Sequence, residues 1–109
     1  MFPGGGNMQQ IMRQVQKMQK NVAKAQEEIA KMTVEGTAGG GAVKVTVTGD
    51  RRVTAVNLSP EVVDPDDVEM LQDLILAAIN DGMKKAEELA EAEMKKVMPA
   101  GLPGFPGLF

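Results

Sequence analysis

Hydrophobic side chains recur every three or four positions through the first third of the chain. In order they are Met8, Ile11, Val15, Met18, Val22, Ala25, Ile29 and Met32. Alternating steps of three and four residues place them on one face of an α-helix, in the pattern of a heptad seam. Asn7 followed by Gln10 resembles a capping box, so we expect a helix over residues 7–32, about 39 Å long. The apolar seam must be buried, either against the rest of the chain or against a second copy.

From residue 33 to residue 59, apolar and polar residues alternate, as they do in β-strands with one buried face. The three expected strands are TVEGTA (33–38), AVKVTVTG (42–49) and VTAVNLS (53–59). In the middle strand Val43, Val45 and Val47 share one face, and Lys and Thr residues take the other. GGG (39–41) and GDRR (49–52) supply the turns, so the strands should form an antiparallel meander.

A second long helix is expected from Asp64 to residue 98, because Asp64 suits the N-cap position and Pro65 the first turn. Between residues 68 and 79, apolar side chains occur on nearly every side, which is typical of a helix buried on more than one face. We expect one face to lie on the sheet and another to meet a partner subunit. Gly82 either permits close helix packing or is a tolerated defect that costs about 1 kcal/mol relative to Ala. The predicted dimer-interface residues are Leu71, Leu74, Ile75, Ala78, Ile79 and Gly82.

These elements predict an α+β fold, an α-β-β-β-α subunit in which two long helices flank a three-stranded antiparallel meander. A single domain is expected over residues 7–98, between a flexible N-terminus (1–6) and a disordered Gly/Pro/Leu/Phe tail (99–109). The core should be small, with three Phe and no Trp or Tyr, so a homodimer is expected. Four tail residues form a candidate docking motif for a protein partner: Leu102, Phe105, Leu108 and Phe109.

Composition excludes much catalytic and metal chemistry. The chain has no Cys and no His, which rules out disulfides, imidazole bases and ordinary zinc sites. No Ser stands with a base, and no carboxylate pair lies in an apolar environment, so we expect no catalytic residue, metal site, cofactor or small-molecule substrate. The longest apolar run, LILAAI (74–79), is too short to cross a membrane, and no signal peptide is visible. We therefore expect a cytoplasmic protein.

Charge is distributed unevenly along a chain whose net charge is −3. Residues 1–34 carry five Lys/Arg and two Glu, whereas residues 65–109 carry four Lys and nine Asp/Glu. Phosphates attract a row of cations through counterion release, and Gln residues between them can donate to phosphate or sugar oxygens. The same arrangement is also typical of the solvated side of an amphipathic helix. The row lies opposite the apolar seam and comprises Arg13, Lys17, Lys20, Lys24 and Lys31.

Neighbouring acidic residues help to choose between these interpretations. The second helix places carboxylates four residues before Lys85 and Lys95, a spacing that favours ion pairs. In the first helix only the two later lysines have Glu at that spacing, and Arg13, Lys17 and Lys20 have none within reach. The absence of acidic residues near these three cations favours binding to a polyanionic partner. The candidate DNA-contacting residues are Arg13, Gln16, Lys17, Lys20 and Lys24, with Arg51 and Arg52 at the predicted hairpin tip.

Two blocks, AGGGAVKVTVTG (38–49) and DPDDVEMLQDLILAAIND (64–81), stand between a Gln/Lys/Met-rich first helix and a Gly/Leu/Pro tail. In this order they resemble the YbaB/EbfC family of bacterial nucleoid-associated proteins, over nearly the whole chain. The resemblance implies an α-β-β-β-α subunit, an intertwined or tweezer-like homodimer with protruding helical arms, and DNA binding at the nucleoid. Carried onto this chain, the basic arm residues are Arg13, Lys17, Lys20 and Lys24. Gly82 departs from the family, which tends to have a better helix former there.

The predicted function is therefore binding of double-stranded DNA with low sequence specificity by a homodimer that affects DNA organisation and gene expression. The alternative is a protein–protein interaction or scaffold module that acts through the seam of the first helix or through the apolar tail. An enzyme is not expected.

Overall fold

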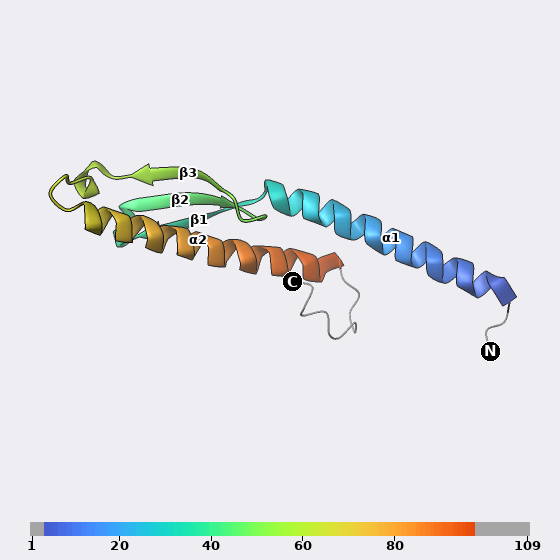
Figure 1. Cartoon of the computed structure of the whole chain (residues 1–109). Helices are drawn as coiled ribbons and strands as arrows, with labels where there is room; N and C mark the ends of the chain where they lie inside the picture. The colour runs from blue at the N-terminus through green and yellow to red at the C-terminus, as the bar shows by residue number, and fades with distance from the viewer. Residues whose placement is uncertain (1–3, 98–109) are drawn as a thin grey trace.

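The chain folds into two long helices joined by a three-stranded antiparallel sheet (Figure 1). The structure, a computed structural model, describes residues 4–97, with side chains from residue 8 onward. The elements are α1 (Gly4–Lys31), β1 (Thr33–Ala38), the 3-10 turn η1 (Gly39–Gly41), β2 (Val43–Thr48), β3 (Val53–Leu58), the 3-10 turn η2 (Pro60–Val62) and α2 (Val68–Val97). The predicted α-β-β-β-α order and α+β class are confirmed. The predicted tail, residues 99–109, lies outside the described residues.

The main core forms where α2 lies across one face of the sheet. β2 is the central strand, and its Val43, Val45 and Val47 have no exposed surface. They pack against Ala78 and Ala86 of α2. Full burial of a valine contributes roughly 1.5–3 kcal/mol relative to leaving it exposed. The alternation in the sequence therefore predicted the buried face of β2 correctly.

α2 covers β1 and β2 but leaves β3 open to solvent. All six residues of β3 are exposed, although Val56 is paired with the fully buried Val45 of β2. Val56 is 46% exposed and Leu58 37% exposed. One edge of the sheet thus carries aliphatic side chains that nothing within residues 8–97 covers.

The opposite edge, the outer side of β1, is occupied by two side chains of α2. The Thr37 N–H donates to Asp81 Oδ2 at 3.0 Å, and Lys85 Nζ donates to the Glu35 carbonyl oxygen at 3.0 Å. Asp81 and Lys85 also form an ion pair with each other at 3.0 Å. The Thr37 hydrogen bond and then the Lys85 ammonium hold the pKa of Asp81 below its ordinary value. These contacts satisfy backbone groups that an edge strand otherwise presents to another chain.

The turn between β1 and β2 depends on its three glycines. Gly39, Gly40 and Gly41 have φ values of 63°, 67° and 94°, a region that is easily reached only by glycine. The sequence predicted a turn here, and the structure identifies it as a single turn of 3-10 helix that returns the chain into β2.

Both helices begin at residues other than those predicted. α1 begins at Gly4, three residues before Asn7. α2 begins at Val68, and its N-cap is Asp67, whose Oδ1 accepts a hydrogen bond of 3.2 Å from the Met70 N–H. Asp64 was the wrong choice because its carboxylate is already used in a tighter local turn, in which it accepts from the Asp66 N–H at 2.9 Å.

A second, smaller core joins the C-terminal half of α1 to the C-terminal half of α2. Ala25 and Ile29 pack against Met94, with Val22 and Val97 at the margin. Beyond this contact α1 extends past the other described elements, and the molecule measures 76 × 22 × 16 Å (Figure 1). We call residues 8–21 of α1 the arm.

Candidate nucleic-acid interface

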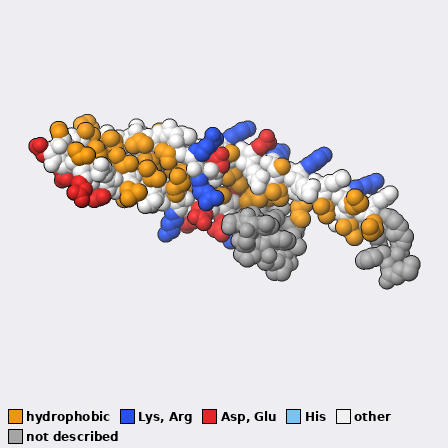
Figure 2. Space-filling view, in the orientation of Figure 1, with side chains coloured by type: hydrophobic (Ala, Val, Ile, Leu, Met, Phe, Trp, Pro, Cys, Tyr) orange, Lys and Arg blue, Asp and Glu red, His pale blue; other side chains and the backbone are white. Residues whose placement is uncertain are grey.

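The arm carries its positive charge on the side away from the rest of the protein. At about 100° per residue, the basic side chains fall within an arc of about 60°, and the seam lies on the opposite side of the helix. All of them are exposed, and Figure 2 shows Lys and Arg side chains along one edge of α1 with hydrophobic side chains along the other. We call this row, which continues past the arm, the basic stripe: Arg13, Lys17, Lys20, Lys24 and Lys31.

Among the described side chains, no ion pair involves the basic stripe. In the part of the chain with described side chains, Lys24 and Lys31 form no ion pair with the Glu residues four positions away, so the pairing expected from the sequence is absent. On α2 the prediction holds for Lys85, which pairs with Asp81. It fails for Lys95, which has no ion pair among the described side chains, whereas Lys96 pairs with Glu93 at 2.6 Å.

Acidic side chains are concentrated at the end of the molecule opposite the arm, where α2 begins. Between residues 53 and 83 the chain has no Lys or Arg. The acidic residues there are Glu61, Asp64, Asp66, Asp67, Glu69, Asp73 and Asp81. Figure 2 shows acidic side chains gathered at the end of the molecule where α2 begins, away from the arm. A polyanion is therefore attracted to one end of the long axis and repelled from the other.

The two arginines of the β2–β3 hairpin are not part of the basic stripe. Arg52 pairs with Asp50, with Nε 3.2 Å from Oδ2. Asp50 also accepts a hydrogen bond from the Thr48 hydroxyl. That hydrogen bond and then the Arg52 guanidinium hold the pKa of Asp50 below its ordinary value. The Arg52 charge is therefore already partly compensated within its own turn.

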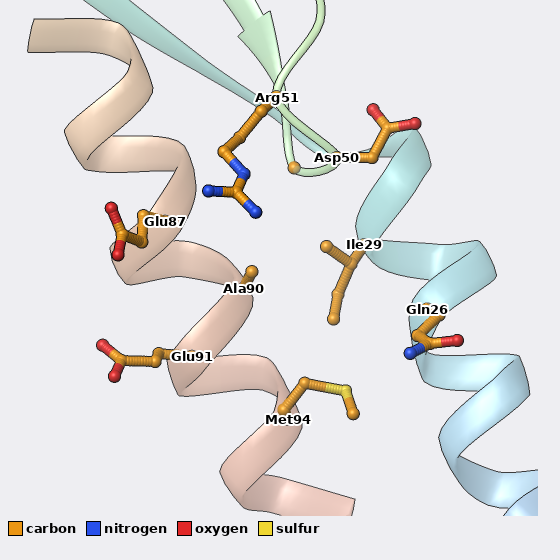
Figure 3. Close-up of a pocket in the computed structure, with 9 residues that line it drawn as sticks. Gln26, Ile29, Asp50, Arg51, Glu87, Ala90, Glu91 and Met94 are labelled. Atoms are coloured by element: carbon orange, nitrogen blue, oxygen red, sulfur yellow. The ribbon is translucent and has the colours of Figure 1, made fainter. Parts of the chain in front are cut away.

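Arg51 is exposed, and its side chain lies on the side of the hairpin that faces α2 (Figure 3). It lines an open pocket of about 490 Å³ between the hairpin and the two helices. Figure 3 shows its guanidinium on the same side of the pocket as Glu87, with Ile29 and Met94 below. Arg51 also has φ = 65°, the left-handed region that is uncommon for a residue with a side chain. No local sequence pattern predicts this pocket, because its lining comes from three segments far apart in the chain.

The residues predicted for a dimer interface divide into two groups. Ala78 and Gly82 are buried against the sheet of their own chain, so they offer no surface to a second copy. Leu71 is half-buried, and Leu74, Ile75 and Ile79 are half-buried at the margin of the core. Leu76 of α2, which is 59% exposed, and the exposed valines of β3 are not among the predicted residues. The alternation of apolar and polar residues in β3 could have indicated its valines. The sequence does not show, however, which strand α2 leaves uncovered.

Comparison with known proteins identifies the family. The model of the YbaB/EbfC DNA-binding family matches residues 4–102. The chain belongs to the YbaB/EbfC DNA-binding family. The match includes the whole α-β-β-β-α unit and hence the arm with its basic stripe.

Relatives from several bacteria agree with the YbaB/EbfC assignment. A protein of Acetivibrio thermocellus named nucleoid-associated protein is 54% identical over 109 residues, which cover 99% of this chain and 96% of that protein. A nucleoid-associated protein of Chloroflexus aurantiacus is 55% identical over 98 residues, covering 90% of this chain and 97% of its own. A crystal structure of an uncharacterized protein from Helicobacter pylori shares the fold, with a TM-score of 0.72, 22% identity, and coverage of 84% of this chain and 96% of the other.

Two further findings concern other kinds of site. Within residues 8–97, no group of three or more acidic side chains is arranged to hold a metal ion. Neither described helix has an apolar stretch long enough to cross a bilayer.

Proposed function

We propose that this YbaB/EbfC protein is a homodimer that binds double-stranded DNA through the basic stripe, with low sequence specificity. The observation that carries the proposal is that the cations of the stripe are exposed, lie in one row and have no acidic partner among the described side chains. The cations Arg13, Lys17, Lys20 and Lys24 share one narrow face of a helix that projects from the core, and no ion pair engages them in the described part of the chain.

The dimensions of the stripe suit a phosphate backbone. From Arg13 to Lys24 the helix rises about 16 Å, and duplex DNA presents one negative charge per roughly 1.7 Å of its axis. The four cations therefore face a surplus of phosphates. Gln16 lies beside the stripe and is exposed, so its amide can donate to a phosphate or sugar oxygen. Contacts of this kind fix orientation without reading bases, which is the basis for low sequence specificity.

A second copy of the chain provides the second arm. The uncovered aliphatic side chains of β3 and α2, including Val56, Leu58 and Leu76, form the surface that we assign to the dimer, with Ile75 and Ile79 beside them. Their burial stabilises a dimer by about 25 cal/mol per Å² of apolar surface. Two arms then present eight cations, from Arg13, Lys17, Lys20 and Lys24 of each chain.

The biological setting proposed is the nucleoid of the bacterial cytoplasm, in keeping with the names of the relatives. There the protein affects DNA organisation and gene expression. Arg51 and Arg52 have a secondary role at most, because Arg52 is ion-paired and Arg51 lies in the pocket. We propose no catalytic activity, cofactor or small-molecule substrate.

Charge reversal on the stripe tests the proposal. The triple variant Arg13→Glu, Lys17→Glu, Lys20→Glu should lose DNA binding while sedimentation still shows a dimer. The matched control reverses three exposed lysines away from the arm: Lys44→Glu, Lys84→Glu and Lys95→Glu. Both variants have the same net charge, so loss confined to the first assigns binding to the stripe. Equal binding by the triple arm variant and the parent protein overturns the assignment.

Salt dependence measures how many cations are engaged. If eight side chains neutralise phosphates, the slope of log affinity against log salt concentration is about −7. Several unrelated duplexes should give the same affinity and slope. A slope near zero contradicts an electrostatic clamp, and affinities that differ strongly among duplexes contradict low specificity.

One observation favours a second candidate function. The N-terminal part of the seam is exposed, with Met8 at 58% and Ile11 at 52%, and such a face can receive an apolar segment of another protein. Deleting residues 99–109 distinguishes a tail-mediated interaction module from a DNA clamp. The deleted protein should keep its affinity for DNA under the main proposal, whereas an interaction module that uses the tail loses its protein partner.

A further inference from the structure

The seam of α1 is covered for only part of its length. From Val22 to Ile29 it packs on α2. Toward the N-terminus the seam continues through half-buried Met18 to exposed side chains, and exposed Met12 lies next to them. The exposed fractions are 58% for Met8, 52% for Ile11, 58% for Met12 and 46% for Val15. This is a continuous aliphatic surface on a monomer arm, which is costly to leave in water.

The part of the seam that α2 covers ends beside the C-terminal residue of α2, Val97. Val97 packs in the same cluster as Val22, and α2 runs antiparallel to α1, toward the N-terminal end of the arm (Figure 1). The chain continues beyond Val97 for twelve residues, MPAGLPGFPGLF. From Val22 to Met8 the arm rises about 21 Å. Twelve residues in a polyproline II helix span about 37 Å. The tail is therefore long enough to reach along the exposed part of the seam, and it starts where the part covered by α2 ends.

The tail has a period of three that fits this surface. Leu102, Phe105 and Leu108 are spaced three residues apart, and a polyproline II helix has three residues per turn, so they share one face. Leu102 and Phe105 each precede a proline, which restricts them to extended or polyproline II backbone.

We propose that residues 98–109 lie as a polyproline II segment along the seam of the arm in the same chain. Stepping at about 3.1 Å per residue from Val97, which packs near Val22, places Leu102 beside Met12 and Phe105 within about 4 Å of the level of Met8. Met side chains adapt to irregular apolar partners and make favourable sulfur–aromatic contacts with rings such as that of Phe105. The preformed backbone of the segment reduces the entropy lost on docking.

The same chain is the favoured source of the tail. A segment tethered at Val97 has an effective concentration in the millimolar range at the arm, which a separate molecule rarely reaches. The tail has no charged residue, and the basic stripe lies on the other side of α1. The segment therefore covers the seam without neutralising the cations, so this inference does not depend on DNA binding.

Paramagnetic labelling of the full-length protein tests the inference. The chain lacks cysteine, so Gly104→Cys provides a single site for a nitroxide, on the glycine side of the segment. In protein with ¹³C-methyl methionine, the Met8 and Met12 signals should lose most of their intensity, while that of Met83, in the main core, should not. Reduction of the nitroxide restores the signals. No loss at Met8 and Met12 beyond that at Met83 overturns the proposal.

Two further measurements identify the contact face and the source of the tail. Phe105→Asp should abolish the signal loss, whereas Ala100→Asp, which adds the same charge to another face of the segment, should leave it. Equal effects of the two variants overturn the assigned face. Mixing with an excess of unlabelled protein should not reduce the loss of Met8 and Met12 signal in chains that carry both the nitroxide and the ¹³C-methyl groups. A loss that falls in proportion to dilution assigns the tail to a second copy and overturns the same-chain contact.

Discussion

Gly82 of α2 lies directly against Gly36 of β1, and this contact sets the distance between the helix and the sheet. A Cβ atom on Gly36 would lie 2.7 Å from the Gly82 Cα, and a Cβ atom on Gly82 would lie 2.6 Å from Val47 Cγ2. Both distances are shorter than real carbon contacts. Of the two interpretations of Gly82 that the sequence left open, close packing is therefore the correct one.

Gly82→Ala should destabilise the protein although alanine is the better helix former. The gain in helix propensity is about 1 kcal/mol, whereas overpacking a well-filled core costs typically 1–3 kcal/mol. We expect a net loss of about 1 kcal/mol in the free energy of unfolding, measured by urea titration. The control Asn80→Ala, at an exposed position of the same helix, should be neutral or stabilising. Equal or greater stability of Gly82→Ala would contradict the packing argument.

Asp81→Asn should weaken the protein at neutral pH and have little effect in acid. The pKa of Asp81 is below its ordinary value in the folded state, so its charge stabilises the fold above the unfolded pKa of about 3.9. That stabilisation is lost as the pH falls through the lower folded pKa. The free energies of unfolding of the parent and the variant should therefore differ most near neutral pH, and they should converge as the pH falls below the folded pKa of Asp81. A difference that does not change with pH would mean that the charge is not responsible.

The small core at the base of the arm should control both stability and DNA binding. Ile29 is 5% exposed and packs with Met94, which is 6% exposed. Ile29→Ala should cost about 2 kcal/mol or more by leaving a cavity, and it should weaken DNA binding because the arm loses its fixed orientation. Met94→Leu keeps the volume and should cost less than about 1.5 kcal/mol. Unchanged affinity in Ile29→Ala, at a temperature where it is folded, would show that the base does not position the arm.

Arg51→Gly should stabilise the hairpin. A non-glycine residue in the left-handed region costs roughly 1–2 kcal/mol, and Arg51 has φ = 65°. Arg51→Ala removes the same charge but keeps the strain, so it serves as the control and should not be stabilised. Thermal unfolding reports the difference. DNA affinity should be nearly the same for both variants and the parent, since Arg51 lies in the pocket; a large equal loss in both would place Arg51 at the DNA.

The sequence predicted the sheet more accurately than the ends of the helices. Alternation located the buried valines of β2, and the glycines located the turn before it, since both signals depend on local backbone geometry. The N-cap of α2 was misplaced because Asp64 and Asp67 are chemically equivalent candidates. Which of them caps the helix depends on the 3-10 turn η2 and the tight turn at Asp66, and these follow from how the chain leaves β3.

The candidate site was predictable only in part. The 3.6-residue period placed Arg13, Lys17 and Lys20 on one face, and the structure has them there, exposed. The state of Lys24 was not predictable, because a Glu four residues away permits an ion pair without requiring one. The orientation of Arg51 depends on the meeting of the hairpin with α2, a long-range contact that no local pattern records.

The ion pair of Asp81 and Lys85 bears on stoichiometry as well as on stability. Because these side chains occupy the outer edge of β1, β3 provides the one open sheet edge within residues 8–97. A sheet with a single open edge can be extended once, by an identical sheet related by a two-fold axis, and the pairing then leaves no strand to recruit another. If the proposed homodimer pairs through this edge, growth by strand addition ends at two chains, and removing the Asp81–Lys85 pair would open a route to longer polymers.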